Sequence, residues 1–146
     1  MIREMRKADL ERCAEILEGA YSSEPYNEKF LPESAYAYVA GKFKSCSDHS
    51  FVICDEAGVQ GFIFWSVSYW SDGPQAVLEE IVVSPDTQGG GLGSKLMNHS
   101  FEYLKKLKVK SAMLWALRDP RVTGFHAKGG FEISGEHCVM FKNLDI

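Results

Sequence analysis

The chain has 146 residues, of which 45% are hydrophobic and 25% charged, as in an ordinary globular domain. This length predicts a single domain over residues 1–146 with a core of its own. A net charge of −4 argues against nucleic-acid binding, which depends on basic surfaces. No apolar run approaches the roughly 18–20 residues of a membrane span, and the charged start lacks the apolar stretch of a signal peptide, so we expect a cytoplasmic protein without a membrane partner.

The cysteines and histidines are scattered along the sequence. They lie at positions 13, 46, 54 and 138 (Cys) and at positions 49, 99, 126 and 137 (His). Without CxxC spacing the cysteines are expected to be reduced thiols. Zinc would require closely spaced ligands, so no metal site is expected.

The first half of the chain predicts a strand, two helices and then a hairpin, with no long linker between them. In chain order the expected elements are a strand at 1–6, a helix capped by Asp9, a helix at 32–44, and strands at 51–54 and 59–69. The turn residues Asp55–Gly58 predict a hairpin between the last two strands, and Ser71–Pro74 predict another turn into the strand that follows.

The second half alternates strands and helices. The expected elements are a strand at 76–83, a helix at 92–107, a strand at 112–117, a helix starting at Asp119-Pro120 and stopping at Gly129-Gly130, and strands at 131–134 and 138–141. The run 112–117 is almost continuously apolar, which predicts a strand covered on both faces. The whole pattern predicts a three-layer α/β (α+β) domain, with a central mixed, mostly antiparallel sheet flanked by helices on both faces.

A glycine-rich loop between a strand and a helix is the strongest functional signal. Four glycines, at positions 89, 90, 91 and 93, lead directly into the helix that begins at Leu92. Glycines let successive backbone N–H groups face one concavity, and the helix N-terminus adds partial positive charge. The loop therefore predicts a pyrophosphate site. The order Gly93-Ser94-Lys95 does not fit a Walker loop, and the antiparallel strands upstream do not fit a dinucleotide fingerprint.

The loop resembles a known signature. Gln88-x-x-Gly91-x-Gly93, after a strand ending in Ile81-Val82-Val83 and a Pro85 turn, resembles the acetyl-coenzyme A motif of the GCN5-related N-acetyltransferase (GNAT) family. The segments Ile2–Leu17 and Asp119–Phe131 are similar to the opening and closing parts of that family. The resemblance covers most of the chain and implies a GNAT-like fold.

The resemblance implies an acetyl-CoA-dependent N-acetyltransferase that acetylates a primary amine of a small molecule by direct attack in a ternary complex. It implies a cofactor site formed by the backbone of Ile81, Val82 and Val83, by the amides of Gln88, Gly89, Gly90, Gly91, Leu92, Gly93 and Ser94, and by Asp119 and Lys128. Asp119 is also expected to cap the last helix. Since family members often dimerise, a homodimer is expected.

Two consecutive acids, Glu79 and Glu80, lie inside an otherwise apolar strand. Because side chains alternate along a strand, one of the two is expected to point toward the cofactor cleft and the other away from it or into a neighbouring pocket. Similarity to the polyamine and thialysine acetyltransferases implies that Glu79 is the general base and Glu80 a substrate contact. The residues alone leave the choice between the two open.

The position of the family's usual tyrosine acid is occupied by His126. A histidine there is able to donate a hydrogen bond to the leaving thiolate, so His126 is a candidate catalytic residue. The alternative is that it only fills the tyrosine site and water supplies the proton. A covalent mechanism through Cys54 or Cys138 is disfavoured because neither has a histidine paired with it in the sequence pattern.

The substrate side is expected to be aromatic and acidic. Tyr26, Tyr69 and Trp70 lie in predicted loops or strand ends, and together with Glu80 they predict a pocket for a cationic amine. Two alternatives remain: an acetyltransferase for protein N-termini, and a non-catalytic acyl-CoA-binding regulator.

Overall fold

The computed structural model describes residues 1–145. The chain divides into two compact units, of which the first is Met1–Leu114 and the second begins at Trp115. In the first unit the elements are β1 (Ile2–Glu4), α1 (Leu10–Tyr21), α2 (Ser34–Cys46), β2 (Ser50–Asp55), β3 (Gly58–Trp70), β4 (Gly73–Val83), α3 (Leu92–Lys106) and β5 (Ala112–Met113). Short 3₁₀ turns occupy Lys7–Asp9, Ser47–His49 and Pro85–Thr87.

The sheet has five strands in the order β1-β2-β3-β4-β5. The first four are antiparallel neighbours, and β5 pairs parallel to β4. Both hairpins form at the predicted turn residues: Gly58 has a φ of 110° and Gly73 a φ of 125°, conformations that glycine adopts without a Cβ clash.

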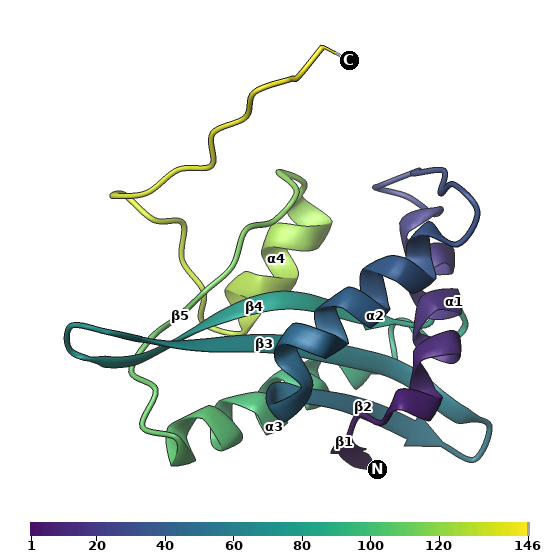
Figure 1. Cartoon of the computed structure of the whole chain (residues 1–146), viewed down its shortest axis with the longest axis horizontal. Coiled ribbons are helices and arrows are strands. Elements are labelled where there is room, and N and C mark those ends of the chain that lie inside the picture. The colour runs from purple at the N-terminus through teal and green to yellow at the C-terminus, as the bar shows by residue number, and fades with distance from the viewer. Residues whose placement is uncertain (146) are drawn as a thin grey trace. The chain divides into compact units, whose positions relative to one another are not determined.

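Helices cover both faces of this sheet (Figure 1). On one face α1 and α2 pack over a core that includes Leu17, Val39, Phe62, Phe64 and Val82. On the other face α3 contacts β2, β3 and β4, where the Phe51 ring meets His99 and Tyr103 edge-on. The predicted three-layer α/β class is therefore confirmed.

The helix α1 begins differently from the prediction. Asp9 makes no side-chain cap for α1. Its carboxylate accepts instead from the Arg6 backbone N–H at 2.8 Å and from the Arg3 guanidinium at 2.8 and 2.9 Å. This largely buried ion pair ties the end of β1 to the start of α1, which lowers the pKa of Asp9.

The strand predicted at 112–117 is only two residues long. Just Ala112 and Met113 pair with β4, and Met113, Trp115 and Leu117 are exposed rather than covered. An apolar run forms a strand only where a neighbouring backbone is there to pair with it, and strand propensity depends strongly on that context.

The second unit contains α4 (Pro120–Lys128), which Asp119 caps as predicted. The Asp119 carboxylate accepts from the Arg121 backbone N–H at 2.9 Å. Beyond Gly130, with a φ of 93°, the described residues form no further helix or strand. The strands predicted at 131–134 and 138–141 are therefore absent from this unit, where the Ser134 hydroxyl instead accepts from the backbone N–H groups of Glu136 and His137.

The contact between β3 and β4 provides a test of the packing. A Cβ added to Gly61 would lie 2.9 Å from the Val82 carbonyl oxygen, whereas one added to Gly41 in α2 would meet nothing within 4 Å. We expect Gly61→Ala to lower the free energy of unfolding by about 1–3 kcal/mol through overpacking. Gly41→Ala should raise it by about 0.5–1 kcal/mol, because alanine favours the helix. Urea denaturation measures both, and equal stabilities for the two variants would contradict the register of β3 and β4.

Candidate functional site

A bulge in β4 brings both acids of this strand to the same helix. Phe64 pairs with Glu80 and the next residue, Trp65, pairs with Leu78, so Glu79 is the extra residue on β4. A bulge interrupts the alternation of side chains. As a result, the Glu79 and Glu80 carboxylates both bond to side chains of α2, whereas regular alternation would direct them to opposite faces of the strand.

Glu79 is held in an ion pair. Its Oε2 atom lies 2.8 Å from Lys42 Nζ, and its Oε1 atom accepts from the Ser66 hydroxyl at 2.8 Å. Desolvation of the carboxylate acts to raise its pKa. The hydrogen bonds from Lys42 and Ser66 and the charge of Lys42 outweigh this effect, so the pKa of Glu79 lies below its usual value.

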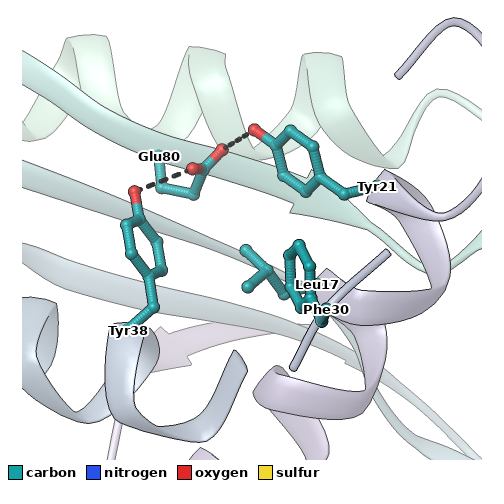
Figure 2. A pocket seen from close by; sticks show the side chains of 5 residues that line it. All are labelled: Leu17, Tyr21, Phe30, Tyr38 and Glu80. Carbon is teal, nitrogen blue, oxygen red and sulfur yellow. Dashed lines mark hydrogen bonds between the residues drawn. The ribbon is translucent and has the colours of Figure 1, made fainter. Parts of the chain in front are cut away.

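Glu80 lies in a cavity of about 200 Å³ between α1, α2 and β4. The other lining residues are Leu17, Tyr21, Phe30 and Tyr38. Figure 2 shows the two tyrosine hydroxyls pointing at the carboxylate from opposite sides, where Tyr21 donates at 2.8 Å and Tyr38 at 3.0 Å. Burial raises the pKa of Glu80, and the hydrogen bonds from the tyrosines and from the Ile81 backbone offset this only in part.

The aromatic residues predicted for the substrate side, Tyr26, Tyr69 and Trp70, do not line this cavity. Tyr69 and Trp70 end β3 and are 80% and 73% exposed, and neither lines this cavity. Tyr26 does not line the cavity either, but its ring packs against that of the lining residue Tyr21, with the ring centroids 4.4 Å apart. Sequence reasoning missed Tyr38 and Lys42 as partners of the acids. Their i, i+4 spacing on one helix, facing two consecutive acids, is the signal that would have found them.

The glycine loop leads into α3 through left-handed glycines and an uncapped helix N-terminus. Gly89 and Gly91 adopt φ values of 85° and 79°, and a Cβ at either position would point into open space. The helix α3 has no side-chain cap, and its first ladder bond runs from the Lys95 N–H to the Gly91 carbonyl. The N–H groups of Leu92, Gly93 and Ser94 therefore have no acceptor within the helix. Gln88 anchors the loop because its side-chain amide donates to the Val83 carbonyl at 3.1 Å.

The strand leading into the loop has an open edge. β5 pairs with β4 only at Ala76 and Val77. On the other side Ile81, Val82 and Val83 pair with β3. Among residues 1–145, the β5 edge of β4 thus has no strand partner beyond Val77, and Ile81–Val83 offer backbone groups there to an extended, amide-containing ligand.

The remaining predicted residues belong to the second unit. His126, on α4, is partly buried, and its Nδ1 atom has no hydrogen-bond partner among the described residues. Its ring meets Phe125 and Phe131 edge-on. Burial lowers its pKa, so the imidazole is neutral at neutral pH. Lys128 is exposed in the last turn of α4.

No group of three or more His, Cys, Asp or Glu side chains within residues 1–145 is arranged to hold a metal ion. None of the helices in this range is long and apolar enough to span a membrane.

Comparison with known proteins adds a family and a fold. The sequence model of the Acetyltransferase (GNAT) family matches residues 10–131. An uncharacterized N-acetyltransferase of Methanocaldococcus jannaschii is 28% identical over 137 residues, which cover 90% of this chain and 60% of the relative. The chain thus spans about 60% of the length of that curated relative.

Solved structures share the fold. A transcriptional regulator from Bacillus halodurans C-125 superposes with a TM-score of 0.75 at 22% identity, covering 97% of this chain and 99% of the other. The protein AAC(6')-Iy, in complex with the bisubstrate analog CoA-S-monomethyl-acetylneamine, gives a TM-score of 0.70 at 19% identity, covering 99% and 98%. At these identities the likeness establishes the fold alone.

The opposite pKa shifts of the two acids predict opposite effects on stability. Folding raises the pKa of Glu80 above 4.5, so the folded state binds a proton at this carboxylate more tightly than the unfolded chain does. The stability that this proton contributes is present at low pH and is lost as pH rises through the folded-state pKa. The stability of Glu80→Gln relative to wild type should therefore increase as pH rises from about 4 to 8.

Glu79→Gln is the matched control. Because the folded pKa of Glu79 is depressed, its contribution is present above 4.5 and is lost as pH falls through the folded value. This variant should be less stable than wild type at pH 7, with the difference shrinking in acid. Urea denaturation across this pH range measures both, and stability differences from wild type that change with pH in the same direction for the two variants would refute the assigned environments.

Proposed function

Because the chain belongs to the Acetyltransferase (GNAT) family, we propose that it transfers the acetyl group of acetyl-CoA to the primary amine of a small molecule. The observation that carries this proposal is the Glu80 cavity, which places a half-buried carboxylate of raised pKa on the strand that leads to the glycine loop. A base and an anion cradle on one strand are what an amine acetyltransferase requires.

The residues present fit acetyl-CoA. The free N–H groups of Leu92, Gly93 and Ser94 and the glycine cradle suit its pyrophosphate, and the edge at Ile81–Val83 suits the amides of its pantetheine arm. Bound there, acetyl-CoA would supply the activated acetyl thioester. Asp119 and Lys128 remain proposed contributors, with the capping role of Asp119 visible in α4.

We assign the base to Glu80 rather than Glu79. An amine arrives as an ammonium ion and must lose a proton before its nitrogen attacks. Glu79 is a poor acceptor for that proton because Lys42 and Ser66 already stabilise its charge. Glu80 faces a cavity, and its raised pKa makes it the stronger base. Its carboxylate takes the proton directly or through one water.

Direct transfer in a ternary complex is favoured over a covalent acetyl-enzyme. Of the four free thiols, Cys13 and Cys46 are buried, and desolvation raises the pKa of both, to about 12 for Cys13. The more accessible Cys54 and Cys138 have no histidine paired with them in the sequence pattern. A thiol with a raised pKa carries little of the reactive thiolate at neutral pH. For the leaving thiolate we propose His126 as hydrogen-bond donor, since its neutral ring retains one N–H.

The cradle predicts a charge-sensitive cofactor site. Asparagine and aspartate both tolerate the left-handed conformation of Gly91 and differ mainly in charge. We expect Gly91→Asp to weaken acetyl-CoA binding at least about tenfold more than Gly91→Asn, because the anion opposes the pyrophosphate. Isothermal titration calorimetry measures this, with circular dichroism as a control for folding. Equal affinities for the two folded variants would overturn the assignment of the phosphate site.

The base assignment predicts a difference between the two acids in turnover. Glu80→Gln should lower kcat roughly 10²-fold or more, with little change in the KM for acetyl-CoA. Glu79→Gln keeps the cavity base and should lose less than about tenfold. Thioester release is the assay, with product identified by mass spectrometry. A larger loss in Glu79→Gln would return the role of base to that residue, and no release with any amine would favour a non-catalytic acyl-CoA-binding regulator.

A further inference from the structure

The charges around the Glu80 cavity point to the kind of amine that enters it. We infer that the acceptor is a small monoamine with an apolar substituent, and that Lys42 selects against diamines and polyamines. This inference rests on the proposed amine acetylation, and it goes beyond it by naming the substrate class and a specificity-determining residue.

The cavity offers one acid to an incoming amine. Glu80 is the only charged residue among its five lining residues. Each of its carboxylate oxygens already accepts one hydrogen bond, Oε1 from the Tyr21 hydroxyl and Oε2 from the Tyr38 hydroxyl. The acceptor capacity that remains on this one carboxylate suits one amine group.

The neighbouring acid is not available to a second amine. Both oxygens of Glu79 have partners, Lys42 on one and Ser66 on the other. The Lys42 ammonium also lies 5.7 Å from the centre of the Tyr38 ring, beside the cavity wall. If a diamine extends toward Glu79, its second ammonium is repelled by the Lys42 ammonium, and the Glu79 carboxylate that could bind it is already paired with Lys42.

The rest of the cavity is apolar. Leu17 and Phe30 contribute hydrocarbon, and the rings of Tyr21 and Tyr38 add aromatic faces that stabilise a cation at short range. Since a water occupies about 30 Å³ in the liquid, a volume of about 200 Å³ holds roughly six or seven groups of that size. This matches a short aliphatic or arylalkyl amine better than a polyamine or a multiply charged amino sugar.

The test compares amines of the same length. Thioester release is measured with pentylamine, phenethylamine and 1,5-diaminopentane, and binding of the same amines is measured by calorimetry without acetyl-CoA. We expect kcat/KM for pentylamine to exceed that for the diamine at least tenfold, with affinities in the same order. Equal or better use of the diamine would overturn the inference while leaving amine acetylation intact. Exclusive use of an N-terminal peptide would overturn it as well.

Amine binding separates failure of the inference from failure of the proposed function. If the amines bind in the expected order but none is acetylated, the cavity inference stands and acetyl transfer is refuted. If none binds and none is acetylated, both are refuted.

Lys42→Met removes the ammonium and keeps an unbranched stem of similar length. The preference for pentylamine over 1,5-diaminopentane should then fall at least tenfold, because Glu79 becomes available to the second amine. Lys44→Met is the matched control: Lys44 lies on the same helix, is exposed, and carries the same charge. It should leave the ratio within twofold. An unchanged ratio in Lys42→Met, or an equal fall in both variants, would overturn the role of Lys42.

Glu79→Gln moves the ratio in the other direction. It leaves the Lys42 ammonium without its counter-ion, so the preference for the monoamine should increase. A fall in that preference would show that Glu79 itself already binds the second amine, which overturns the inference. This variant also covers the case in which Lys42→Met does not fold.

Discussion

The bulge at Glu79 is the constraint on which the acidic site depends. In a regular strand the two consecutive acids would point to opposite faces, and only one of them would meet α2. The extra residue turns both acids toward that helix, where Tyr38 and Lys42 lie one turn apart. Tyr38 donates to Glu80 and Lys42 to Glu79. The spacing of a helical turn thus matches the displacement that the bulge produces.

The two acids acquire different properties from their partners. Lys42 is a cation and lowers the proton affinity of Glu79, whereas the tyrosines are neutral donors that hold Glu80 without neutralising it. Keeping a carboxylate partly buried and unneutralised costs stability, since its desolvation is only partly offset. A pair of acids whose environments separate their pKa values is a recurring feature of catalytic sites. Of the two acids, only Glu80 carries this cost, because Lys42 neutralises Glu79.

Local signals in the sequence were sufficient for the loop, both hairpins and the cap of α4. Each depends on a few adjacent residues, such as Asp119 before Pro120. The bulge was not predictable from the run 76–83, because a bulge appears only in the register with the partner strand. The cavity was missed for a similar reason. Its walls come from α1, α2 and β4, so the exposed pair Tyr69 and Trp70 looked more suitable than the true lining residues Leu17 and Tyr38.

The short β5 explains why the open edge and the acids occur together. Pairing between β5 and β4 ends at Val77, and the bulge follows two residues later at Glu79. A strand as long as the apolar run 112–117 predicts would continue this pairing in the same register and occupy the edge of β4 up to about Ile81. With the shorter strand, β4 offers a free edge for an extended ligand beside a face that carries Glu80. A strand rises about 3.3 Å per residue, so Glu80 lies roughly 10 Å along β4 from Val83 at the start of the glycine loop. The apolar run that predicts a buried strand therefore stops pairing early, at Met113, and this leaves the β5 edge of β4 without a strand partner from Leu78 to Val83 among the described residues.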